Sequence, residues 1–91
     1  MGERYRATCK HVEDGDTFVT ANDNWIRLAR VDTPELGTAQ GSLAKKILQG
    51  LIEGKEIIYE QVGVSYDRKV SEVWINNKSV NDYMRAQGYP A

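Results

Sequence analysis

Residues 14–36 read "DGDTFVTANDNWIRLARVDTPEL", and they contain the clearest indications of the architecture of this chain. Two short runs in this stretch, 17–21 and 25–31, have the β-branched and aromatic residues that are typical of strands. The letters "NDN" between them predict a hairpin turn, because Asn and Asp tolerate left-handed backbone conformations. Pro34 is expected to end the second run, since proline cannot donate a hydrogen bond to a neighbouring strand. The stretch therefore predicts a hairpin with an acidic turn at each end.

The flanking sequence predicts further strands. Residues 4–12 precede the first acidic turn, and residues 55–62 and 69–75 follow later in the chain. Each of these segments has the composition of a strand. The letters "GVSYDR" between the last two segments predict an exposed loop.

Two helices are also expected. The first begins at Ser42, and Gly54 stands where a helix C-cap would. Its apolar residues fall on one stripe, as in a helix packed on a core; they are Leu43, Ala44, Ile47, Leu48, Leu51 and Ile52. The second follows the turn at Asn76 and Asn77, is capped by Ser79 and ends before Gly88.

The order of these elements, β-β-β-α-β-β-α, is the layout of a five-stranded barrel of the OB type. The predicted fold class is therefore mainly β with α, and the length of 91 residues predicts one domain, 1–91. Many such barrels bind oligonucleotides, but the fold alone does not establish a function.

Composition excludes several classes of protein. The net charge is −1, so the chain does not coat nucleic acid by bulk charge, and any phosphate chemistry must depend on a few placed cations. Cys9 is the only cysteine, which excludes an intrachain disulfide and a Cys-rich zinc site. No stretch approaches the roughly 18 apolar residues of a membrane span, and no signal peptide is recognisable. We therefore expect no membrane association, and the compartment stays open.

The two acidic turns are the candidate functional feature. A barrel would bring Asp16 and Asp32, at the ends of their strands, toward one point. Two carboxylates repel each other there, so one must take up a proton or a cation must bind. A hard cation with oxygen ligands, such as Ca²⁺, would relieve this repulsion. The alternative is that Asp14 and Asp16 only shape a turn. We expect that role for Asp14 and a metal for Asp16.

Four segments, "DGDTF", "IRLARVDTPE", "YDR" and "NNKSVNDYMRAQG", resemble the staphylococcal nuclease (thermonuclease) family, in that family's order and over nearly the whole chain. The short acidic turn is common by itself, but its combination with the downstream segments is specific. The resemblance implies a nuclease domain.

The resemblance also implies a metal site and a base. The matching Ca²⁺ ligands are Asp16, Asp32 and the carbonyl group of Thr33. Glu35 matches the family's carboxylate that acts on the attacking water, as a general base or an orienting acceptor. Pro34 restricts the backbone next to Glu35, so the carboxylate of Glu35 is expected to be held in one direction rather than free.

Arg27 and Arg68 match the family's phosphate-binding arginines. The planar guanidinium group can donate two parallel hydrogen bonds to phosphoryl oxygens, which lysine cannot do. Tyr66 matches a family tyrosine that packs near the bound nucleotide. Arg30 lies on the other face of its strand from Arg27 and is expected to be a surface charge.

The expected function is Ca²⁺-dependent hydrolysis of DNA and RNA by a monomer, with little sequence preference, with single strands favoured and 3′-phosphates left. One alternative is a catalytically silent barrel of the same fold that binds nucleic acid or a protein; such family members generally lose the carboxylates and arginines. Another is a plain single-strand-binding OB module, which would need a basic groove with stacking aromatic residues.

The chain departs from the family's pattern in two places. The loop between Glu35 and the first helix is short, so a substrate preference does not transfer. The chain also ends at Ala91, before the family's aromatic-rich segment and further helix. For a C-terminally shortened domain we expect weaker nucleotide binding and lower stability than in a full-length relative.

Overall fold

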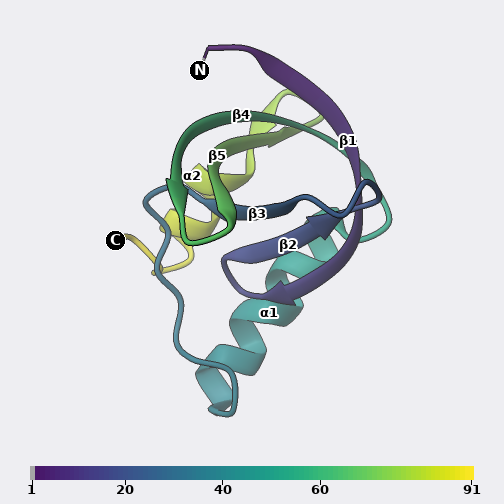
Figure 1. Ribbon diagram of the computed structural model, residues 1–91. Helices are drawn as coiled ribbons and strands as arrows, with labels where there is room; N and C mark the ends of the chain where they lie inside the picture. The colour runs from purple at the N-terminus through teal and green to yellow at the C-terminus, as the bar shows by residue number, and fades with distance from the viewer. Residues whose placement is uncertain (1) are drawn as a thin grey trace.

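The computed structural model describes residues 2–91, which form one sheet and two helices (Figure 1). The strands are β1 (Arg4–Asp14), β2 (Thr17–Thr20), β3 (Trp25–Leu28), β4 (Glu56–Ser65), β5 (Arg68–Ile75) and β6 (Lys78–Ser79). The helices are α1 (Ala39–Ile52) and α2 (Val80–Ala86). The predicted order is confirmed, with the short β6 added between β5 and α2. No helix within residues 2–91 is long and apolar enough to cross a membrane.

Five of the strands close into a ring. The sheet has the order β3-β2-β1-β4-β5-β6, and β3 also pairs with β5 in parallel. The long strand β1 serves both halves, since Arg4–Thr8 pairs with β4 and Cys9–Asp14 pairs with β2. Register shifts beside Cys9 and Val12 accompany the bend of β1 seen in Figure 1. The mainly β fold expected from the sequence is confirmed.

The core lies inside this ring and beneath α1. Strand positions that alternate toward the interior are buried, as the period of two requires; the fully buried ones include Val12, Phe18, Ile26, Leu28, Ile57 and Val73. Helix α1 covers the core with Ala44, Leu48 and Ile52. Cys9 is also buried, and burial raises the pKa of its thiol to about 11. It therefore packs as a small apolar residue.

Helix α1 begins earlier than the sequence indicated. Its first residue is Ala39 rather than Ser42, because the Thr38 hydroxyl caps the helix by accepting a hydrogen bond from the Gly41 amide at 3.0 Å. Leu43, expected in the apolar stripe, is 55% exposed. The C-terminal prediction is confirmed, since Gly54 has the positive φ of 78° that a residue just past a helix end often adopts.

Two strand predictions were wrong at their ends. Strand β3 stops at Leu28 rather than at residue 31, since Arg30 adopts a φ of 53° that an extended strand does not allow. The segment "GVSYDR" is not a loop, because β4 and β5 continue through it and only Tyr66 and Asp67 form the turn. The hairpin therefore reaches farther than expected and carries Arg68 within its ladder, opposite Ser65.

Candidate active site

The first acidic turn is held by its own side chains and by its neighbours. Asp14 Oδ1 accepts a hydrogen bond from the Asp16 amide at 3.0 Å, which confirms the turn-shaping role expected for Asp14. Gly15 is buried, and a Cβ atom there would lie 2.7 Å from Ala44 Cβ and 2.9 Å from Thr33 Cβ. The first acidic turn, residues 13–16, thus packs directly on α1 and on the second acidic segment, residues 30–36.

Asp16 presents a largely buried carboxylate. Its exposed fraction is 8%, its Oδ1 accepts a hydrogen bond from the Thr17 hydroxyl at 2.9 Å, and its Oδ2 lies 3.4 Å from Arg27 Nη2. Burial raises its pKa to about 6, and the neighbouring Asp14 carboxylate adds to this rise. The Thr17 hydroxyl and the Arg27 charge lower the pKa, but by less.

The two arginines approach Asp16 from different strands. Arg27 on β3 lies opposite Thr17 on β2, and its Nη1 donates to the Leu28 carbonyl at 2.9 Å. Arg68 at the start of β5 donates from Nη1 to Thr17 Oγ1 at 3.2 Å. The order Arg68–Thr17–Asp16–Arg27 is therefore one continuous chain of polar contacts, which we call the arginine cluster.

Two residues of this neighbourhood escaped the sequence analysis. Thr17 is buried and connects Arg68 with Asp16; its place directly after Asp16 in "DGDT" was the available signal. Ser65 also holds Arg68, since its hydroxyl lies 3.3 Å from Arg68 Nη2 and its carbonyl oxygen lies 3.5 Å from Arg68 Nε. Finding Ser65 would have required the true length of the β4–β5 hairpin.

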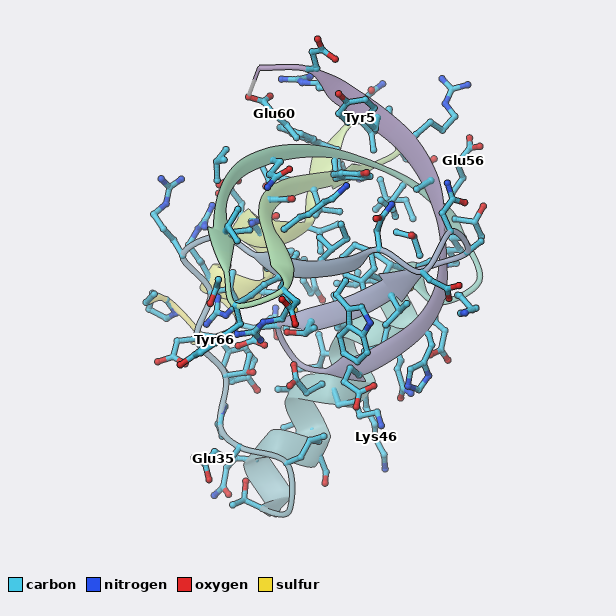
Figure 2. All side chains as sticks on the ribbon, viewed as in Figure 1. Tyr5, Glu35, Lys46, Glu56, Glu60 and Tyr66 are labelled. Carbon is cyan, nitrogen blue, oxygen red and sulfur yellow. The ribbon has the colours of Figure 1, made fainter. Side chains whose placement is uncertain are left out.

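Tyr66 lies at the tip of the β4–β5 hairpin (Figure 2). It is 91% exposed, and its ring centroid lies 6.0 Å from the central carbon of the Arg68 guanidinium group. Its φ of 56° belongs to the left-handed region, which is uncommon for a tyrosine. The turn thus projects an aromatic ring into solvent beside the arginine cluster.

The second acidic segment has a different setting. Asp32 and Glu35 are exposed and Thr33 is half-buried. None of the ion pairs found among residues 2–91 involves the carboxylates of Asp32 or Glu35. Figure 2 shows Glu35 on the chain that leads into α1, apart from Tyr66. The structure thus pairs Asp16 with Arg27 directly and with Arg68 through Thr17, and Gly15 packs on Thr33. Asp32 and Glu35 extend from the adjoining segment.

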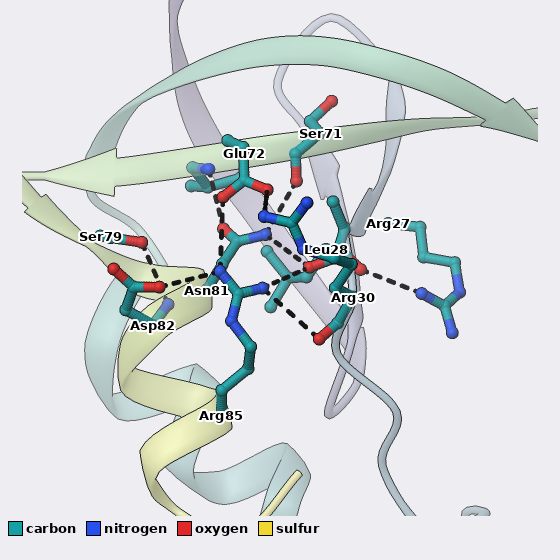
Figure 3. Close-up of polar contacts among 11 residues, drawn as sticks. Arg27, Leu28, Arg30, Ser71, Glu72, Ser79, Asn81, Asp82 and Arg85 are labelled. Atoms are coloured by element: carbon teal, nitrogen blue, oxygen red, sulfur yellow. Dashed lines mark hydrogen bonds and ion pairs between the residues drawn. The ribbon is translucent and has the colours of Figure 1, made fainter. Parts of the chain in front are cut away.

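Helix α2 and the residues after it hold the backbone around the start of the second acidic segment. Figure 3 shows the contacts made by Asn81 and Arg85 of α2. The fully buried Asn81 donates to the Ala29 carbonyl at 3.1 Å and accepts from the Val73 amide at 2.8 Å. Arg85 Nη1 donates to the same Ala29 carbonyl at 2.8 Å. Farther along, the Asp32 amide donates to the Tyr89 carbonyl at 3.0 Å. The backbone between Ala29 and Asp32 is therefore anchored at both ends.

Arg30, which the sequence placed on the surface, is exposed. Its guanidinium group lies 3.3 Å from the Glu72 carboxylate. The reason differs from strand parity, because the left-handed conformation of Arg30 ends the strand.

The predicted metal ligands suit a hard cation. Asp16, Asp32 and the Thr33 carbonyl offer oxygen atoms only, which is the donor chemistry that Ca²⁺ prefers. The close contact between Gly15 and Thr33 links the turn of Asp16 to the segment that holds the other two ligands. Within residues 2–91 there is no cluster of three or more His, Cys, Asp and Glu side chains placed to hold a metal. The predicted set has two carboxylates and a backbone carbonyl, so it does not require such a cluster.

Comparison with known proteins identifies the family of most of the chain. The model of the staphylococcal nuclease homologue family matches residues 25–91. A protein of Haemophilus influenzae named as an uncharacterized endonuclease is 32% identical over 92 residues, which is 93% of this chain and 52% of the relative. An uncharacterized protein of Bacillus anthracis is 29% identical over 100 residues, 96% of this chain and 47% of the relative. The chain thus spans about half the length of the curated relatives it matches.

Proposed function

Since this chain belongs to the staphylococcal nuclease homologue family, we propose that it hydrolyses phosphodiester bonds of DNA and RNA in a Ca²⁺-dependent reaction. The name of the Haemophilus influenzae relative, an endonuclease, supports the nuclease class. The observation that carries the proposal is the arginine cluster, in which two guanidinium groups flank the Thr17 hydroxyl and the Asp16 carboxylate.

Arg27 and Arg68 would bind the scissile phosphate. Negative charge grows on the non-bridging oxygens as phosphorus becomes five-coordinate, and arginine forks placed beforehand stabilise that charge. The hydrogen bonds of Arg68 to Ser65 and Thr17 limit its rotamers, so little reorganisation is needed when the phosphate arrives. In other phosphoryl transfers one such arginine contributes about 10³–10⁵ in rate.

Glu35 would accept the proton of the attacking water. The water oxygen forms the new bond to phosphorus, the bond from phosphorus to the 5′ oxygen breaks, and the phosphate remains on the 3′ oxygen. The leaving 5′ oxygen gains a proton from solvent or from an arginine-bound water. A positioned base contributes about 10²–10⁴ in rate.

Asp16, Asp32 and the Thr33 carbonyl would hold Ca²⁺. When bound, the ion supplies positive charge that offsets the charge on a phosphate oxygen. The raised pKa of Asp16 means that the carboxylate must give up a proton before it serves as a ligand, so binding should be favoured above about pH 6.

The substrate is proposed to be single-stranded by preference. The exposed ring of Tyr66 offers a stacking surface, and every base has a face that can stack, which fits little sequence preference. An unpaired base reaches such a ring without the cost of opening a duplex. All of the proposed residues come from one chain, so a monomer is the expected active form.

Digestion of single-stranded DNA with Ca²⁺ and with a chelator tests the proposal. Wild-type protein should cleave only with Ca²⁺, and Glu35→Gln and Arg68→Ala should lose at least about 100-fold in kcat. Arg6→Ala and Glu56→Gln are matched controls, because these side chains lie on β1 and β4, are exposed and pair with each other. Cleavage that ignores the chelator would refute the mechanism, and binding of DNA without cleavage would favour the silent module.

A further inference from the structure

The first turn of α1 touches the backbone of Glu35. Gly41 is buried, and a Cβ atom at this position would lie 1.9 Å from the Glu35 carbonyl oxygen and 2.6 Å from its carbon. Both neighbours are backbone atoms, so a larger residue fits only if the helix or the Glu35 segment moves. Glycine is a poor helix former, and the requirement for this close approach explains its presence inside the helix.

Thr38 binds the same carbonyl group. Its Oγ1 donates to the Glu35 carbonyl oxygen at 2.8 Å, and its amide donates to that oxygen at 3.4 Å. The Thr38 hydroxyl also accepts the Gly41 amide at 3.0 Å. One hydroxyl therefore caps the helix and binds the peptide unit of Glu35.

Little freedom remains in the backbone of Glu35. Pro34, directly before Glu35, has a fixed φ, and only Leu36 and Gly37 separate Glu35 from the helix cap at Thr38. The side-chain torsions are then the main freedom of the exposed carboxylate.

We propose that Thr38 and Gly41 are positioning residues that hold Glu35 where its carboxylate can meet the attacking water. This inference rests on the proposed role of Glu35 as the base. A base acts only within hydrogen-bonding reach of the proton that it takes, and a displacement of about 1 Å can cost about 10²-fold in rate. Helix α1, which otherwise serves the core, thereby acquires a part in the chemistry.

A pair of glycine substitutions within α1 separates this role from helix stability. Gly41→Ala should displace Glu35 and lower kcat by about 10–100-fold, with KM changed by less than about threefold. Gly50→Ala is the matched control, because Gly50 lies in the same helix with nothing within 4 Å of a Cβ atom there. Its kcat should stay within about twofold of wild type, since alanine only favours the helix.

A second pair of variants keeps the inference testable if Gly41→Ala does not fold. Thr38→Val removes the hydroxyl at nearly equal volume and should lower kcat by about 10-fold, whereas Thr38→Ser keeps the hydroxyl and should restore it. All rates are measured at saturating Ca²⁺ and below the onset of thermal unfolding of each variant. Calorimetric Ca²⁺ affinity should be unchanged in all four variants, because none alters a proposed ligand.

The outcomes distinguish the two levels of the proposal. A Glu35→Gln variant as fast as wild type would refute the role of Glu35 as the base. If Glu35→Gln is slow but Gly41→Ala and Thr38→Val match Gly50→Ala and Thr38→Ser in kcat, the positioning role alone is overturned. A selective loss of kcat in Gly41→Ala and Thr38→Val supports it.

Discussion

Asp16 and Arg27 face each other across the β2–β3 hairpin, with 3.4 Å between the carboxylate and the guanidinium group. A residue proposed to hold the metal is thus paired with one proposed to hold the phosphate. Burial outweighs this attraction, since the pKa of Asp16 is raised rather than lowered. Asp16 could therefore exchange Arg27 for a metal cation, and Arg27 could exchange Asp16 for a phosphate group.

The raised pKa of Asp16 predicts a pH dependence of stability in the metal-free protein. The folded pKa of about 6 lies above the ordinary value of 3.8. The stabilisation from the protonated group is fully present below about pH 4 and is lost as pH rises through about 6. Asp16→Asn should therefore gain about 1–3 kcal/mol over wild type at pH 7 and little at pH 4.

Urea titrations in EDTA at the two pH values measure this gain. Asp67→Asn is the control, because Asp67 is exposed in the hairpin turn. Equal pH dependence in the wild-type and Asp16→Asn proteins would contradict the prediction.

Thr17 should support catalysis by connecting Arg68 with Asp16. Thr17→Val keeps the shape of the buried side chain but removes the hydroxyl that joins Arg68 to Asp16. Hydrogen bonds to charged groups contribute about 1.5–3 kcal/mol, so kcat/KM should fall by about 10–100-fold. Thr17→Ser should recover most of the loss. Initial-rate kinetics on single-stranded DNA measure both, and full activity of Thr17→Val would show that the link is dispensable.

Asn81 should be among the most important residues for stability. Its side chain satisfies the Val73 amide and the Ala29 and Ser71 carbonyls, and all three groups would lose a partner in Asn81→Ala. We expect a loss of about 3–5 kcal/mol in the free energy of unfolding. Gln40→Ala on the exposed side of α1 is the control. A loss below about 1 kcal/mol in a urea titration would contradict this assignment.

Tyr66 should contribute to binding rather than to folding. Tyr66→Asn tolerates the left-handed backbone at this turn but lacks the ring, so KM for single-stranded DNA should rise by about 10-fold. Tyr66→Phe retains the ring and should bind as wild type does. The unfolding midpoint should be unchanged in both, because the side chain is 91% exposed. An unaltered KM in Tyr66→Asn would remove Tyr66 from the substrate surface.

The barrel was predictable from the sequence because its strands have regular composition and its turns carry explicit signals. The turn at Asn76 and Asn77 and the cap at Ser79 were found correctly, since their chemistry is local. The ends of β3 and of the β4–β5 hairpin were missed, because tertiary pairing decides them. Nothing in the sequence around Arg30 indicates that this residue adopts a left-handed backbone conformation.

The sequence predicted three residues that the structure brings together, but it did not predict the contacts that connect them. Asp16, Arg27 and Arg68 were named from their motifs, and the structure places them in one chain of contacts. Thr17 was not predicted because its side chain is uncharged, and its role depends on hydrogen bonds that only the fold creates. The contact between Gly41 and Glu35 was not predicted either, since the only sign of a close backbone approach in a sequence is a glycine.

The parallel pairing of β3 with β5 makes the arginine cluster a late product of folding. Only three residue pairs join these strands, and they connect positions more than forty residues apart, such as Ile26 and Lys69. Such a distant pairing forms after local helices and hairpins. On dilution from urea, the helical circular-dichroism signal should thus return before nuclease activity does. The time at which activity returns would then report when β3 pairs with β5.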